Sequence, residues 1–225
     1  MKVESYWGHT FLPDLIRPDG VVFDFGVYDG GFSELVAPRC ERVIGFEPDP
    51  AWRERAALPA NVEVVPKALA AKRGRVRLHL NREKCSSIHY SEAAAGAAEV
   101  QTITLADALA LEPKARIELI KMDIEGEEVP VLRDAAPALF ERVAQMTVEF
   151  HDFLDPASLP AIRAVIDKME RLGFLAIRFS WHSYGDLLFV SRRLIPLSIW
   201  DRASLRIVHK YGQGIGRIVR RACQV

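Results

Sequence analysis

The first residues in this sequence that could do chemistry form a glycine-rich turn at positions 24–31. Glycines such as Gly26 let a ligand approach the backbone, and they leave N–H groups free where a helix begins. Glu47 stands 23 positions after Asp24, near the spacing of roughly 20 residues between such a turn and a ribose-binding acid. That acid can accept both ribose hydroxyl hydrogens, and Asp24 can balance a cationic amino-acid group. These features predict a nucleoside ligand bound by Asp24, Gly26 and Glu47.

Tyr28 indicates which kind of nucleoside fits. It occupies the place of the second glycine in the GxGxxG fingerprint, where the missing side chain makes room for a pyrophosphate. A large side chain there disfavours NAD and FAD. S-adenosylmethionine carries no phosphate and needs no such room. We therefore favour S-adenosylmethionine, and a small NAD-dependent oxidoreductase is the weaker alternative.

Two later strand ends carry acids and a histidine. The apolar run 117–122 leads into Asp123 and further acids, and Glu149 and His151 stand at the end of the run 144–150. Ligands of open α/β sheets bind beyond the carboxyl ends of strands. We therefore expect Asp123, Glu149 and His151 to be the catalytic residues, as bases or as groups that orient an acceptor. A structural role for His151 is equally open.

The same acids raise the question of a metal ion. Asp123 and Glu149 offer hard oxygen ligands, which suit magnesium. The three cysteines lie far apart and form no metal-binding spacing. Glu127 and Glu128 are explained by the start of a helix, where acids are favoured anyway. We expect no metal, and a divalent cation at Asp123 and Glu149 is the less favoured alternative.

These residues need a sheet that brings strand ends together. The chain alternates short apolar runs with amphipathic stretches, which is typical of parallel strands joined by helices. Runs at 75–80 and 100–104 instead predict a small antiparallel insertion, interrupted by a loose Ala-rich segment at 92–98. One amphipathic helix is expected from Gly126 to Leu139, and another after Asp155. The strands expected in the main sheet are 21–25, 42–46, 62–65, 117–122, 144–150, 174–179 and 187–190.

Several of these segments resemble the FkbM family of methyltransferases, over roughly residues 18–191. The resemblance implies an α/β, Rossmann-like class I methyltransferase fold: a mostly parallel sheet of seven strands, the last one antiparallel, with helices on both faces. It also implies S-adenosylmethionine as methyl donor, with Tyr28, Ala68 and Asp123 among the residues that bind it. The most specific matching segment is 121–127, and the others are 21–33, 46–48, 67–69, 86–87, 104–107, 131–132 and 148–151.

Members of this family usually methylate hydroxyl groups of polyketides, sugars or lipid-linked glycans. The resemblance therefore implies an O-methyltransferase whose partner is a small-molecule or glycan acceptor. Two alternatives stay open from the sequence. One is transfer of the methyl group to nitrogen. The other is a nucleoside-binding module without catalysis.

Charge and composition bear on location and partners. The formal net charge is zero, so we expect no nucleic acid partner. The unpaired cysteines are typical of a reducing compartment, and the expected location is cytoplasmic.

Residues 192–225 carry eight Lys or Arg and one acid, and residues 1–191 carry 22 basic and 29 acidic residues. We expect a domain over 1–191 and a basic amphipathic tail that packs on protein, including a second subunit, or lies on the inner membrane surface.

Overall fold

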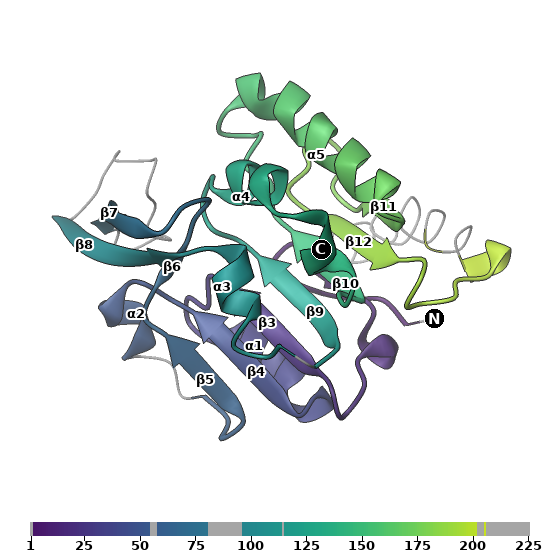
Figure 1. Ribbon diagram of the computed structural model, residues 1–225, viewed down its shortest axis with the longest axis horizontal. Helices are drawn as coiled ribbons and strands as arrows, with labels where there is room; N and C mark the ends of the chain where they lie inside the picture. Colours follow the sequence, from purple (N-terminus) through teal and green to yellow (C-terminus); the bar gives the residue numbers. More distant parts are fainter. Residues whose placement is uncertain (1, 55–57, 81–95, 114, 202–204, 206–225) are drawn as a thin grey trace, which may run out of the picture.

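The computed structural model describes residues 2–54, 58–80, 96–113, 115–201 and 205, and Figure 1 shows its layers. The main sheet consists of β3 (Val21–Phe25), β4 (Arg42–Phe46), β5 (Val62–Val65), β9 (Ile117–Met122), β10 (Gln145–Val148), β11 (Phe174–Arg178) and β12 (Leu187–Ser191). Its strand order is β11-β12-β10-β9-β3-β4-β5. β12 runs antiparallel to both of its neighbours, and the other neighbouring pairs are parallel. The predicted Rossmann-like class I methyltransferase fold, with its reversed last strand, is confirmed.

Helices cover both faces of this sheet (Figure 1). Side chains alternate along β3, so Phe23 and Phe25 pack under three helices on one face, whereas Val22 packs under a single helix on the other. The three helices are α3 (Leu105–Leu109), α4 (Glu128–Asp134) and α5 (Leu159–Arg171), and the single helix is α1 (Gly31–Val36). Other helical segments within the described residues are α2 (Pro50–Arg53), the 3₁₀ helices Pro13–Leu15, Ala37–Arg39, Pro137–Phe140 and Pro156–Ser158, and the helical residues 199–201.

The predicted helix from Gly126 to Leu139 is wrong in its extent. The structure has α4, which ends at Asp134, and then a separate 3₁₀ helix. Ala135 and Ala136 between them are extended, because the residue before a proline avoids the helical region and Pro137 starts the new helix. The predicted strand 144–150 is also shorter in the structure, where β10 ends at Val148.

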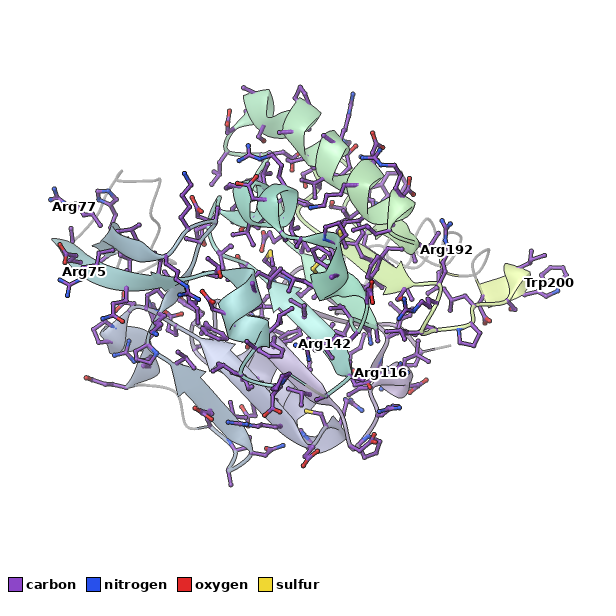
Figure 2. The ribbon with its side chains drawn as sticks, viewed as in Figure 1. Arg75, Arg77, Arg116, Arg142, Arg192 and Trp200 are labelled. Atoms are coloured by element: carbon purple, nitrogen blue, oxygen red, sulfur yellow. The ribbon has the colours of Figure 1, made fainter. Side chains whose placement is uncertain are left out.

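The antiparallel insertion forms a separate small sheet of β6 (Ala68–Leu69), β7 (Gly74–Leu80) and β8 (Gly96–Ile103). β7 and β8 pair antiparallel, as predicted. β8 begins at Gly96, so residues 96–98 belong to a strand and not to the expected loose segment, while 86–87 and 92–95 lie outside the described residues. Arg75 and Arg77 project from β7 at one end of the molecule (Figure 2).

An N-terminal hairpin, which the sequence analysis did not predict, joins β1 (Glu4–Tyr6) to β2 (His9–Phe11). Its two-residue turn places Trp7 and Gly8 at φ 47° and 88°, the geometry of the tight turn that suits a hairpin. Thr10 then ties β2 to the sheet: its N–H and hydroxyl donate to the two carboxylate oxygens of Asp186, at 3.1 and 2.6 Å. The hairpin is therefore anchored beside β12.

Replacing Thr10 with valine should lower the free energy of unfolding by about 1–3 kcal/mol, because the buried carboxylate of Asp186 then loses a hydroxyl donor without gaining water. Urea unfolding measures this change. Ser5→Val in the exposed position of β1 is the matched control and should leave stability nearly unchanged. Equal stability of both variants would contradict the anchoring role of Thr10.

The start of the predicted tail packs on the domain. Ile195, Leu197 and Leu205 are buried against the same face of the sheet as residues of β11 and β12. Trp200 is 83% exposed and projects at the far end of this segment (Figure 2). Residues 206–225 lie outside the described part of the chain, so contact of the tail with a membrane or a second subunit stays a prediction. Among the described residues, no helix has both the length and the apolarity needed to cross a membrane.

Candidate active site

The glycine-rich turn after β3 has the backbone geometry that the sequence predicts. Gly26 has φ +90°, and an added Cβ would overlap the carbonyl oxygen of Asp123. Only glycine combines this conformation with such a close approach of two backbones. The next residues lead to α1, whose first turn follows Gly30 in the left-handed conformation. The turn thus holds the ends of β3 and β9 against each other.

Glu47, after β4, is held by the same turn. One of its carboxylate oxygens accepts the N–H of Tyr28 at 2.9 Å, and the other accepts the N–H of Asp49 at 2.8 Å. Each oxygen keeps a second lone pair for a further donor. Burial raises the pKa of Glu47 to about 7. The carboxylate is therefore fixed in direction and still able to accept a pair of hydroxyl hydrogens.

A partly open cavity lies beyond these strand ends. Five of the predicted cofactor-binding residues line it: Gly26, Tyr28, Glu47, Ala68 and Asp123. The remaining lining residues are Phe46, Pro48, Trp52, Lys67, Leu69, Leu78, Ile124 and Glu125. The rings of Tyr28 and Trp52 lie 4.0 Å apart and form an aromatic wall near Glu47. The structure thus brings these five residues to one cavity.

Asp24, the remaining predicted cofactor residue, does not line the cavity. Its side chain points to the α1 face of the sheet and is fully buried. It accepts the hydroxyl of Ser33 at 2.7 Å, and its other oxygen lies 3.6 Å from the Lys121 ammonium. Lys121 in turn donates to the carbonyl of Gly26. This position does not support direct contact between Asp24 and a ligand in the cavity. Asp24 instead pairs with the Lys121 ammonium, which donates to the glycine-rich turn.

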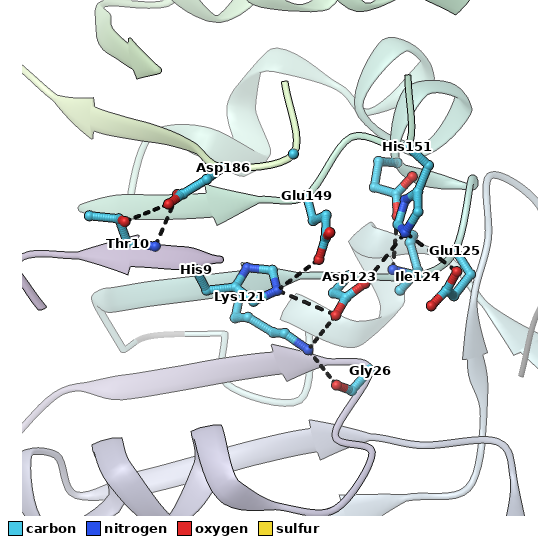
Figure 3. Close-up of polar contacts among 12 residues, drawn as sticks. His9, Thr10, Gly26, Lys121, Asp123, Ile124, Glu125, Glu149, His151 and Asp186 are labelled. Carbon is cyan, nitrogen blue, oxygen red and sulfur yellow. Dashed lines mark hydrogen bonds and ion pairs between the residues drawn. The ribbon is translucent and has the colours of Figure 1, made fainter. Parts of the chain in front are cut away.

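Asp123 lines the cavity and is the centre of a polar network (Figure 3). Its Oδ2 lies 3.3 Å from Nε2 of His9 and 3.4 Å from Nζ of Lys121. The same His9 nitrogen lies 3.6 Å from a carboxylate oxygen of Glu149. Two of the three predicted catalytic residues therefore meet at a histidine contributed by the N-terminal hairpin.

His151 approaches Asp123 from the other side. Its Nε2 lies 3.4 Å from Glu125 and 3.9 Å from Oδ1 of Asp123. Its Nδ1 lies 3.3 Å from Glu128, whose two oxygens also accept the N–H groups of Ile124 and Gly126. The interpretation of Glu128 as an ordinary acid at a helix start is incomplete, because this carboxylate is buried and organises the loop before α4.

The two histidines have opposite pKa shifts. Burial lowers the pKa of His9, so its imidazole is neutral near pH 7. Burial also opposes the charged form of His151, but its carboxylate neighbours, with Glu128 the strongest, raise the pKa to about 9. His151 is therefore protonated near pH 7 in the ligand-free protein, which makes it a poor proton acceptor in that state.

The two acids at this end also differ. Burial and the charge of Asp123 raise the pKa of Glu149 to about 8. Burial would raise the pKa of Asp123 as well, but Lys121 and His9 outweigh it and hold that pKa below its usual range. At neutral pH, Asp123 is thus ionised and faces the cavity, whereas neither Glu149 nor His151 lines it.

Sequence reasoning missed His9 and Lys121 as site residues. His9 lies 114 positions from Asp123, in a segment with no strong strand pattern, so no spacing signal could have found it. Lys121 had a signal: it is a charged residue within the apolar run 117–122, and a lysine in a buried strand needs a carboxylate partner.

The fold and this site define the class. A parallel sheet with one reversed strand, a glycine turn after its first strand and an acid after its second are the parts of a class I methyltransferase domain. The family model for the methyltransferase FkbM domain matches residues 24–176. The chain belongs to the FkbM methyltransferase family. The match includes the residues from Asp24 to His151, whereas His9 precedes it.

Solved structures with a similar arrangement include methyltransferase FkbM from Methylobacillus flagellatus KT, at 14% identity and a TM-score of 0.47 over 77% of this chain and 44% of that one. An rRNA methylase from Streptococcus thermophilus has 9% identity and a TM-score of 0.45 over 79% of this chain and 88% of that one. The chain thus spans less than half the length of the FkbM structure. The comparison with curated proteins found no similar sequence.

Proposed function

We propose that this protein transfers a methyl group from S-adenosylmethionine to a hydroxyl oxygen of a sugar, glycan or polyketide-type small molecule. One observation carries the proposal: one cavity in a methyltransferase domain is lined both by the fixed carboxylate of Glu47 and by the ionised Asp123. The first suits the ribose of a nucleoside, and the second suits the acceptor.

The reaction needs alignment and removal of one proton. The acceptor oxygen attacks the methyl carbon, the carbon–sulfur bond breaks, and its electron pair converts the sulfonium into a neutral thioether. The hydroxyl proton leaves to a carboxylate or to water. Alignment of the reacting atoms contributes on the order of 7 to 11 kcal/mol in favourable cases. Asp123 would supply the orientation by accepting the hydroxyl hydrogen, and Lys121 and His9 fix its carboxylate.

An acceptor with an apolar face is supported by exposed side chains near this end. Trp7 precedes His9 by two positions and is 84% exposed, and Phe153 follows His151 by two positions and is 53% exposed. The turn at Gly8 and the loop that carries Phe153 both lie next to Gly185. A Cβ added at Gly8 would contact the carbonyl oxygen of Gly185, and a Cβ added at Gly185 would contact the ring of Phe153. Aromatic rings of this kind can stack on a sugar ring or a polyketide chain.

The proposal is tested by incubating the full chain with S-adenosylmethionine and a panel of sugar, glycan and polyketide hydroxyl compounds. Release of S-adenosylhomocysteine and an O-methyl signal in the product by NMR are expected. An N-methyl product from amine-bearing acceptors alone would favour the alternative of nitrogen transfer. Binding of NAD in place of S-adenosylmethionine in a calorimetric titration would overturn the cofactor assignment.

Glu47→Ala should weaken S-adenosylmethionine binding by about 1–3 kcal/mol, or about 5- to 150-fold, because the ribose hydroxyls lose a buried acceptor. Calorimetry measures the dissociation constant, and thermal unfolding checks that the variant is folded. Glu54→Gln, an exposed acid at the end of α2, is the control and should bind as the unmodified protein does. Unchanged affinity in folded Glu47→Ala would remove Glu47 from the ribose site.

A further inference from the structure

Two carboxylates and an imidazole converge at the acceptor edge of the cavity. Asp123, Glu125 and His151 each offer one ligand atom, and these atoms lie within 4.8 Å of one another. Metal–ligand bonds of about 2.0–2.2 Å would be reached by small side-chain rotations from these positions. Asp123 and Glu125 line the cavity, so an ion bound between them would face it; Figure 3 shows both side chains beside His151.

The ring of His151 has the orientation of a metal ligand. Metal-binding histidines usually have their second ring nitrogen held by a carboxylate, which fixes the ring and directs the other nitrogen at the ion. Here Glu128 lies 3.3 Å from Nδ1 and is itself held by the N–H groups of Ile124 and Gly126. His151 is only 8% exposed, and its contacts with these acids are ion pairs: Nδ1, which is buried, has no hydrogen-bond partner within the described part of the chain. Its Nε2 faces two carboxylates, those of Glu125 and Asp123.

The two carboxylate oxygens of Asp123 face different groups, and an ion bound on the Oδ1 side would replace the proton of His151. Lys121 and His9 both contact Oδ2 of Asp123, whereas Oδ1 faces His151. A second possible ligand set, with His9 and Glu149, shares the Oδ2 side with the Lys121 ammonium, which would repel an ion. Three carboxylates, those of Asp123, Glu125 and Glu128, surround the single imidazole.

We propose that Asp123, Glu125 and His151 bind one divalent transition-metal ion at the acceptor side of the cavity. One imidazole and two carboxylates suit manganese, cobalt or zinc better than calcium. This site replaces the sequence-based expectation of no metal, and it uses Glu125 and His151 in place of Glu149. A bound ion lowers the pKa of an oxygen ligand, which is the help that a hydroxyl acceptor needs. That catalytic role rests on the proposed function, whereas the binding itself does not.

Calorimetric titration of the chelator-treated full chain with Mn²⁺, and separately with Zn²⁺, tests the site. One ion per chain is expected. Glu125→Gln and His151→Ala should each weaken binding by at least about 100-fold, and Glu128→Gln, which only positions the histidine, by about 10- to 100-fold. His182→Ala is the matched control, because this histidine is exposed and outside the cluster, and it should bind as the unmodified protein does.

Two results would overturn the site: no binding of either ion at millimolar concentration, or affinity unchanged in both folded Glu125→Gln and folded His151→Ala. Thermal unfolding identifies folded variants. A parallel titration with S-adenosylmethionine separates this proposal from the proposed function. Cofactor binding without ion binding overturns the metal site alone, and ion binding without cofactor binding supports the site while contradicting the methyltransferase assignment.

Discussion

Asp123→Asn should lower kcat for methyl transfer by about 10²- to 10⁴-fold, the range expected when the group that accepts or orients a reacting proton is lost. The amide has nearly the same shape, but it carries no charge and presents a donor where a hydroxyl hydrogen would be accepted. The neighbouring Lys121 and His9 would also lose the anion that they contact. Release of S-adenosylhomocysteine with a responsive acceptor measures the effect.

The matched control for this variant is Asp167→Asn, an exposed carboxylate on α5 far from the cavity. It should keep the activity of the unmodified protein. S-adenosylmethionine affinity, measured in parallel, separates a chemical defect from a binding defect. If folded Asp123→Asn turned over at the normal rate, Asp123 would have no role in proton handling or orientation.

Lys121→Met should lower the free energy of unfolding by about 3–5 kcal/mol, because it leaves the fully buried carboxylate of Asp24 without its cation. The methionine fills most of the volume, so the loss of charge dominates. The turn at Gly26 also loses the ammonium that its carbonyl accepts. Denaturant unfolding at several pH values measures this stability.

The pH dependence and a second variant identify the cause. Burial already raises the pKa of Asp24, and without Lys121 it would rise further. A folded-state pKa above the unfolded one means that stability falls as pH rises above the unfolded value, so the defect should be larger at pH 8 than at pH 5. Asp24→Asn combined with Lys121→Met should recover much of the loss. A pH-independent defect that the double variant does not relieve would mean that packing, not charge, is responsible.

Much of the fold and the cofactor end of the site could be predicted from local patterns. Short, mostly apolar runs such as 117–122 predict buried strands, and a glycine turn followed by an acid one strand later indicates two strand ends that lie close together. Gly26 and Glu47 line one cavity because each follows directly after a strand end. Asp24 does not line it, because this residue lies within β3 and points to one face of the sheet, and sequence spacing does not say which face.

The acceptor end needed the tertiary structure. His9 reaches Asp123 only because the N-terminal hairpin is anchored beside β12 by Thr10 and Asp186, and that contact crosses almost the whole chain. Lys121, Glu125 and Glu128 are all visible in the sequence, but their partners depend on side-chain direction and on the loop before α4. The sequence by itself indicated the family, through its matching motifs, and it indicated the strands and the residues at their carboxyl ends, because these follow from local patterns. The direction in which each charged group points, and hence which carboxylates can share a cation, was decided only by packing between distant segments.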